Sequence, residues 1–288
     1  MTFATSKIMV LVGNPWFIGL GTLASIVGIV WTTYDKTTNL SASIVPIIFL
    51  VISIFVFLGG FFYALVVRTE VNSWKNTTYH IHRINHIYRD ILSKNFSGSV
   101  APKNEELAKD EKDTMKSICQ KIMKIYTGLI RKECVVTIKF ITENDAGRSY
   151  CQTYVRSEDN CPRDDETPAI FEVGTGHNTA FDRALLPRSS KKCSHFYSPD
   201  LRMEKDYSNE RQHYSDHYRS VIVVPIRFYG ERPNFELNKD DLGFLCVDTP
   251  SPHRLKEGAH VELLAAFADQ LYNFASLMRG KYKVNVSI

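Results

Sequence analysis

Residues 218–228 read YRSVIVVPIRF, an apolar and β-branched run with a proline, Pro225, near its middle. Such a run has the composition of a buried strand. Proline has no N–H to donate to a β-ladder, however, and within sheets it is found on edge strands, at strand starts and at bulges. We therefore expect a strand whose pairing ends on one side at Pro225, or a sheet that bends there.

The elements before this strand follow a definite order. A helix with an apolar stripe is expected near residues 105–132. Two strands, 134–141 and 149–157, come after it, and the turn Asn144–Gly147 between them is typical of a hairpin. A polar region with short helical pieces then fills residues 159–217.

After the strand at 218–228, residues 241–248 predict another strand, and residues 260–278 predict a strongly amphipathic helix. Strands paired as hairpins between terminal helices favour an antiparallel sheet covered by helices. The fold class predicted for this part of the chain is therefore α+β.

Two uncharged stretches, residues 8–34 and 40–67, precede this domain. Each is longer than the roughly 20 residues that an α-helix needs to cross a bilayer. We predict membrane spans near 14–34 and 44–67, which together make residues 1–68 a transmembrane hairpin.

A cleavable signal peptide is the competing interpretation of the first stretch. Its apolar part is longer than the usual core of about 7–15 residues. It also runs into Tyr34-Asp35-Lys36 instead of a cleavage site with small residues. A membrane span is therefore favoured.

Basic residues flank the second span on one side only. Five of them, Arg68, Lys75, Arg83, Arg89 and Lys94, follow it, while the short connector between the spans offers only Lys36. The positive-inside rule then places both termini and the α+β domain in the cytoplasm, on an inner or plasma membrane. The six cysteines form no C-x-x-C pair, which suits free thiols in a reducing compartment.

Residues 69–104 are expected to hold an amphipathic connecting helix and a linker. Apolar side chains recur at helical spacing at Ile81, Ile84, Tyr88 and Ile91, so a neighbouring helix should pack there, and a homo-oligomer is expected. His82 and His86 stand one turn apart, but no third metal ligand joins them on that face. Solvated surface histidines are the favoured interpretation.

The proline-containing strand and two later segments resemble a known family. They are SVIVVPI within residues 220–226, LGFLCVDTPSPHRL at 242–255 and HVELLAAFADQLYNF at 260–274. Together they resemble the GAF domain family, in which a V-P-I/L strand, a G-x-L-x-h-D strand and a closing h-x-x-L-A-x-Q-h helix follow one another. The resemblance covers residues 105–279 and leaves 280–288 as a tail; the related PAS fold is the alternative.

The resemblance implies a ligand pocket between one face of the sheet and the variable middle segment. That segment is rich in aromatic and polar side chains, the usual components of a small-molecule site. The ligand and any cofactor stay unidentified. The candidate ligand-binding residues are Asn178, Thr179, Phe181, His195, Tyr197, Asp200, Tyr214, Tyr218, Arg219 and Ser220.

Several specific chemistries are not supported by the sequence. The Asn-Lys-x-Phe-x-Asp-Glu signature of cyclic-nucleotide-binding relatives is missing, and the SSKKCSH context of Cys193 does not match a bilin attachment site. The enzymatic branch, free methionine-R-sulfoxide reductases, needs cysteines before the V-P strand, where this chain reads HYSDHYRS. Spacing brings His213 and His217 together but supplies no complete metal site.

No Walker A, G-x-S-x-G or kinase motif is present either, so an enzyme is not expected. The formal net charge of +4 comes from basic residues interleaved with acidic ones, so nucleic acid is not an expected partner.

The expected function is a membrane-anchored cytoplasmic sensor, which binds a small molecule or a protein and signals through the connecting helix to the membrane or a partner. One alternative is a bacterial membrane effector, in which a nucleotide signal clusters the two spans in the bilayer. Another is a degenerate GAF domain that serves only as a dimerisation platform.

Overall fold

The structure is a computed structural model of the whole chain. The chain consists of two compact units, residues 1–75 and residues 76–288. The residues that the structure describes are 25, 26, 28, 40–96, 104–158, 170–185, 195–210, 214–227 and 241–286.

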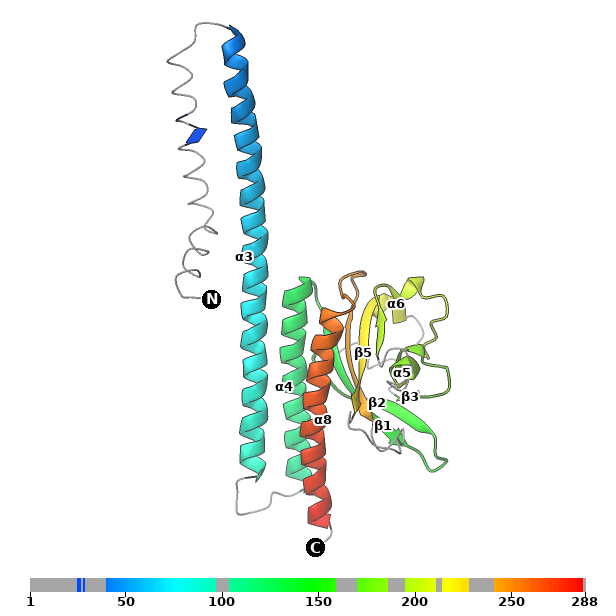
Figure 1. Cartoon of the computed structure of the whole chain (residues 1–288). Helices are drawn as coiled ribbons and strands as arrows, with labels where there is room; N and C mark the ends of the chain where they lie inside the picture. The colour runs from blue at the N-terminus through cyan, green and yellow to red at the C-terminus, as the bar shows by residue number, and fades with distance from the viewer. Residues whose placement is uncertain are drawn as a thin grey trace, which may run out of the picture. The chain divides into compact units, whose positions relative to one another are not determined.

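One long helix, α3 (Leu40–Phe96), includes the predicted second span and the predicted connecting helix without a break (Figure 1). The first predicted span, 14–34, lies outside the described residues apart from three positions. Among the described residues, α3 is the single helix long and apolar enough to cross a membrane, and its apolar part is not buried in protein. The helix is thus established, while its passage through a bilayer stays a prediction from length and composition.

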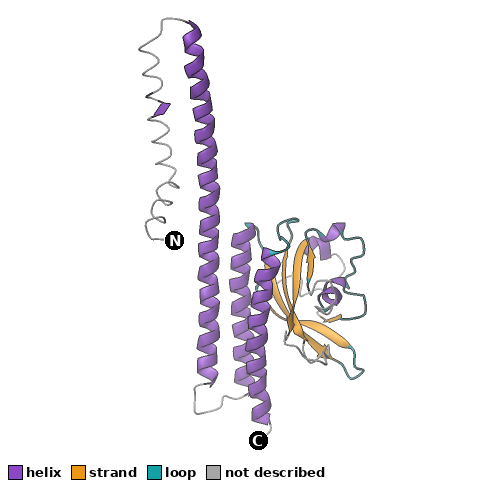
Figure 2. Cartoon of the chain, viewed as in Figure 1, coloured by secondary structure: helices purple, strands orange, loops and turns teal. Residues whose placement is uncertain are grey.

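In the described part of the chain, six antiparallel strands form one sheet in the order β3-β2-β1-β6-β5-β4. The bounds are β1 Val135–Glu143, β2 Ser149–Arg156, β3 Ile170–Glu172, β4 Phe196–Ser198, β5 Ser220–Arg227 and β6 Asp241–Thr249. Helices pack against this sheet, which confirms the α+β class (Figure 2). The three-residue strands β3 and β4 lie in the region predicted to be polar with short helical pieces. They were not predicted, because three residues are too few to show an alternation of apolar and polar side chains.

The predicted β1–β2 hairpin is present. Its turn is closed by the side chain of Asn144, whose Oδ1 accepts the backbone N–H groups of Ala146 at 3.1 Å and Arg148 at 2.9 Å. Gly147 adopts a positive φ of 72°, a backbone conformation that favours glycine.

Strand β5 contains Pro225 and pairs on both sides. Its described ladder with β4 covers Val221–Val223, while on the other side Pro225 lies opposite Phe244 of β6. The position that would face Pro225 from the β4 side lies outside the described residues, so the end of pairing there stays a prediction.

One face of the sheet is covered by α4 (Asn104–Ile130) and α8 (Ala259–Val286), and the part of α3 from residue 76 onward shares their core cluster, with Tyr88 of α3 packing against Phe274 of α8. The predicted apolar faces of these helices are buried: Ile84 of α3 and Ile118 of α4 are fully buried in one core cluster with strand residues such as Ile138. Helix α8 runs to Val286, so most of the predicted tail is helical.

The other face of the sheet carries short elements and a second, smaller core cluster. These elements are α5 (Thr179–Ala184), the 3-10 helix η2 (Leu201–Met203) and α6 (Tyr214–His217), which confirm the expected short helices. Neighbouring side chains of a strand point to opposite faces. Accordingly Phe244 of β6 belongs to this cluster and Leu245 to the helical one.

His260 at the start of α8 makes stability depend on pH. Burial lowers the pKa of its imidazole, and the positive charge of Lys256 lowers it further. The ring must be neutral for its Nδ1 to accept the backbone N–H of Lys256 at 3.2 Å. Below the unfolded pKa of about 6.5 the unfolded chain binds more protons, so the free energy of unfolding should fall as pH drops from about 7.5 to 5.5.

Chemical denaturation across this pH range measures that dependence. A His260→Gln variant should show a flatter profile than the wild-type chain. Equal pH slopes for the two chains would contradict the role given to His260.

Candidate functional site

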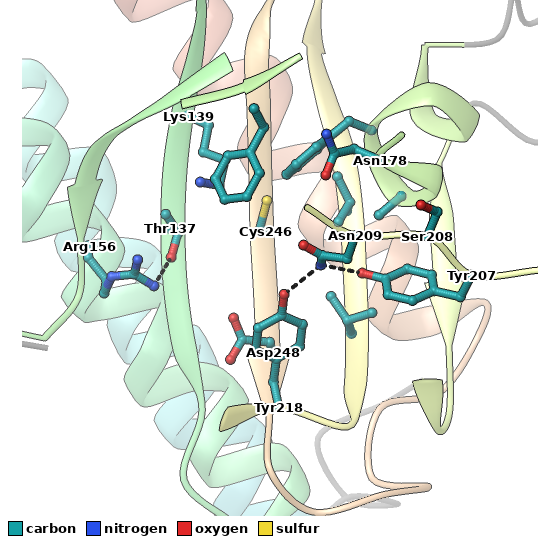
Figure 3. Close-up of a pocket in the computed structure, with 15 residues that line it drawn as sticks. Thr137, Lys139, Arg156, Asn178, Tyr207, Ser208, Asn209, Tyr218, Cys246 and Asp248 are labelled. Atoms are coloured by element: carbon teal, nitrogen blue, oxygen red, sulfur yellow. Dashed lines mark hydrogen bonds between the residues drawn. The ribbon is translucent and has the colours of Figure 1, made fainter. Parts of the chain in front are cut away.

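A cavity of about 60 Å³ lies on the face of the sheet opposite α4 and α8 (Figure 3). Its floor is formed by strands β1, β2, β5 and β6, and its other walls come from α5 and from the segment around residues 207–209. The cavity therefore lies where the resemblance places a pocket, between a sheet face and the middle segment.

The floor carries polar and charged side chains. Thr137 and Lys139 alternate along β1, and Cys246 and Asp248 alternate along β6, so all four point to the same face. Arg156, at the end of β2, adds a second cation. All of these side chains are buried, which is unusual for charged residues unless they have partners.

Lys139 occupies the aromatic end of the cavity. Its Nζ donates a hydrogen bond to Thr153 Oγ1 at 2.8 Å and lies 4.3 Å from the centre of the Phe171 ring and 5.8 Å from that of Phe181. These distances are those of cation–π contacts. The ammonium group is thus held in place by a hydroxyl and two aromatic rings, among other contacts.

Arg156 and Cys246 define the rest of the floor. A guanidinium nitrogen of Arg156 donates to Thr137 Oγ1 at 3.1 Å. Burial raises the pKa of the Cys246 thiol to about 12, although Lys139 and Arg156 lower it in part. At neutral pH this thiol is protonated, so it lacks the thiolate that a nucleophilic cysteine needs.

The opposite wall is held together by Asn209. Its side-chain amide donates to the hydroxyls of Tyr207 and Tyr218, each at 2.9 Å (Figure 3). Asn178 fixes the same segment, because its amide donates to the carbonyl of Glu172 at 2.9 Å and its Oδ1 accepts the N–H of Glu210 at 3.2 Å. Polar side chains therefore tie this wall to α5 and β3.

Three of the ten predicted ligand-binding residues, Asn178, Phe181 and Tyr218, line the cavity. Two more support it from behind. Thr179 accepts the N–H of Ser208 at 2.9 Å, and the ring of Tyr214 packs against those of Tyr207 and Tyr218.

The other five predicted residues do not line the cavity. Arg219 forms an ion pair with the buried carboxylate of Asp200, which holds the pKa of that carboxyl below its usual range. Ser220 donates to the carbonyl of Ser198 at 3.3 Å. Tyr197 packs against the helical core and donates to the carbonyl of Leu255 at 3.0 Å. His195 lies two residues before Tyr197 and is half-buried.

The charged floor of the cavity was not predicted from the sequence. A signal for it is present in TIKF, residues 137–140, and in LCVD, residues 245–248. In both segments a polar or charged side chain occupies every second position of an otherwise apolar strand. Alternation of this kind is typical of a strand with one polar face. Here that face is buried.

The part of the chain that the structure describes contains no group of three or more His, Cys, Asp or Glu side chains able to hold a metal ion. The Nε2 atoms of His82 and His86 lie 2.8 Å apart on α3, and the pair is exposed. Cys193 and His213 fall outside the described residues.

No known protein-family model matches the chain, and no curated protein matches it. Solved structures do match, among them GAF domains. The GAF domain of a phosphoenolpyruvate-protein phosphotransferase from Acinetobacter is 10% identical, with 65% of this chain and 99% of that chain covered and a TM-score of 0.37. The corresponding domain from Coxiella burnetii is 13% identical, with 69% and 96% covered and a TM-score of 0.38.

A type II free methionine-R-sulfoxide reductase from Thermoplasma acidophilum also matches. It is 13% identical, with 60% of this chain and 96% of that chain covered and a TM-score of 0.41. These values describe a resemblance over part of the chain. Neither a ligand nor an activity of this chain follows from them.

Proposed function

We propose that residues 105–279 form a non-enzymatic sensor domain that binds a small molecule in the cavity on the sheet. One observation carries the proposal: the cavity floor buries Lys139, Arg156 and Asp248, where a purely structural core would bury apolar side chains. Burying charge costs free energy, so its concentration at one cavity favours a binding role over a packing role.

The sheet supplies a short route from the cavity to the helices. Lys139 faces the cavity, and its neighbour Ile138 packs in the helical core that also contains Ile84 of α3 and Leu271 of α8. A movement of β1 on ligand binding would therefore reach α3 through the shared helical core. We propose that this packing relays the signal.

The rest of the proposal concerns the membrane. The uncharged part of α3 and the first predicted span would anchor the chain in an inner or plasma membrane, with the domain in the cytoplasm and the chain in a homo-oligomer. Length, composition and flanking basic residues support this arrangement. The nucleotide-triggered effector is less favoured, because the 60 Å³ cavity is far smaller than the roughly 300–1,000 Å³ of drug-sized ligand sites.

A thermal-shift screen of the full chain in lipid nanodiscs tests binding. Its compounds would be amino acids, small organic acids, sugars, nucleosides and nucleotides. A ligand at 100 times its Kd stabilises the folded state by about 2.7 kcal/mol, which corresponds to a rise in Tm of roughly 5–10 °C for a domain of this size.

Two variants make the screen specific. Ala180→Leu adds bulk at the cavity wall and should abolish the shift, while Ala266→Leu on the exposed face of α8 should retain it. If no compound stabilises the wild-type chain more than the Ala180→Leu chain, the sensor proposal is wrong and the dimerisation platform is favoured.

A further inference from the structure

Residues 76–96 of α3, the docked segment, lie on the domain with their apolar face. Ile84 is fully buried there, and Ile81 is partly buried against the same core cluster. The ring of Tyr88 lies 5.4 Å from that of Phe274 on α8. The backbone of the segment, however, approaches α4 and α8 less closely than these two helices approach each other. Apolar side chains therefore hold the segment in place across a wider gap.

Two polar groups of the docked segment oppose this packing. Among the described residues, neither the Tyr88 hydroxyl nor Nδ1 of His80 has a hydrogen-bond partner, and both atoms are shielded from solvent. Burial raises the pKa of Tyr88, so its hydroxyl keeps its proton and lacks an acceptor for it. A buried polar group of this kind gives up its hydrogen bonds to water and gains none in return.

His80 has no escape from this cost through a charge. Its side chain is only 8% exposed. Burial lowers the pKa of the imidazole, and the positive charges of Lys121 and Lys124 on α4 lower it further, so the ring is neutral at pH 7. A neutral imidazole carries one N–H and one bare nitrogen. Whichever of the two Nδ1 is, it stays unsatisfied while the segment is docked.

Polar contacts hold the other end of the docked segment. The ammonium group of Lys94 lies 2.7 Å from Oδ2 of Asp110 on α4, and the side-chain amide of Asn95 donates to the same oxygen at 3.5 Å. The two unsatisfied groups thus lie toward residue 76, while these hydrogen bonds lie toward residue 96.

We infer that the docked segment is releasable: it detaches from α4 and α8, beginning at residue 76, while α4, α8 and the sheet stay folded. The contacts of Lys94 and Asn95 with Asp110 act as the hinge. Detachment returns the Tyr88 hydroxyl and the His80 imidazole to water, which offsets part of the loss of apolar burial. Elements that move in signalling come from the less stable parts of a fold. The inference goes beyond the proposed function, because release needs no ligand.

Thiol labelling of a Thr77→Cys chain in nanodiscs measures release. Thr77 is 2% exposed, so a thiol at this position reacts when the segment detaches. Cys119 of α4 is the internal standard: it is fully buried beside the backbone of Ile138 on β1 and stays covered until the domain unfolds. Mass spectrometry follows each site, and each rate is divided by the rate of the same thiol in denaturant.

The two sites should differ widely. We expect the thiol introduced at position 77 to react at least about 10-fold faster than Cys119, because the segment opens below the free energy of global unfolding. Equal rates would show that α3 leaves only when the whole domain unfolds, and would overturn the inference.

Tyr88→Phe, added to the Thr77→Cys chain, tests the cause. Because it removes only the unsatisfied hydroxyl, it should slow labelling at position 77 by about 10-fold, and His80→Leu should act in the same direction. Tyr197→Phe is the matched control, since the hydroxyl of Tyr197 donates to the carbonyl of Leu255 at 3.0 Å. It should leave labelling at position 77 unchanged. Unchanged or faster labelling in the Tyr88→Phe chain would overturn the inference.

Discussion

Replacing Arg227 with methionine is expected to lower the free energy of unfolding by about 3–5 kcal/mol, because the substitution leaves a buried carboxylate without its counter-ion. Arg227 Nε lies 2.7 Å from Asp241 Oδ1, and the two side chains are 3% and 0% exposed. A terminal nitrogen of the same guanidinium donates to the carbonyl of Ala184 at 2.9 Å. The pair therefore joins the ends of β5 and β6 to the end of α5.

The double substitution Arg227→Met/Asp241→Leu should recover most of that loss. An apolar pair of similar volume removes both desolvation costs, so the double variant should lie close to the wild-type chain or above it. Denaturant unfolding of the four chains gives the coupling free energy. Additive losses in the double variant would contradict this description of the pair.

An exposed ion pair provides the control. Arg89 and Asp90 on α3 are 65% and 66% exposed, so water already solvates both charges. Arg89→Met should leave the unfolding transition of residues 105–279 unchanged.

Gly243→Ala is expected to destabilise the chain by about 3 kcal/mol, at the upper end of the range for an overpacked site. A Cβ built on Gly243 would lie 1.9 Å from the carbonyl oxygen of Lys139 and 2.9 Å from the Cα of Phe140. Both neighbours are backbone atoms of β1, so the strands themselves would have to separate. The change would also displace Lys139 and weaken the cavity floor.

Gly128→Ala is the matched control. A Cβ at Gly128 would meet only the side-chain Nδ2 of Asn76, at 3.2 Å, and that group can move. Because Gly128 lies inside helix α4, alanine should stabilise the helix by about 0.5–1 kcal/mol, which offsets the cost of the contact with Asn76. Chemical denaturation should therefore separate the two variants by several kcal/mol, and equal stabilities would show that β1 and β6 are not packed as described.

The elements with a strong periodic signal could be predicted from the sequence. The hairpin of β1 and β2, the proline strand β5, strand β6 and helix α8 each combine an apolar repeat with turn or cap residues. Strands β3 and β4 could not be predicted, because three residues in a polar segment show no period and exist through pairing with distant strands.

The site was predicted only in part, for a reason that strand geometry makes clear. The resemblance implies a pocket at residues 177–220, a segment in which Tyr197 is an aromatic candidate. Within β4, however, Phe196 and Tyr197 point to opposite faces, and Tyr197 faces the helical core. The cations of the floor lie on β1 and β2, outside the segment that the resemblance indicated.

The most direct test of the central claim is hydrogen–deuterium exchange of the full chain in nanodiscs, with and without the compound that gives the largest thermal shift. We expect slower exchange in the cavity wall, above all at the backbone N–H groups of Ser208 and Glu210, which are bonded to Thr179 and Asn178. The Ala180→Leu chain should show no such protection. Protection confined to residues outside the cavity, or no change at the wall, would contradict a ligand site on the sheet.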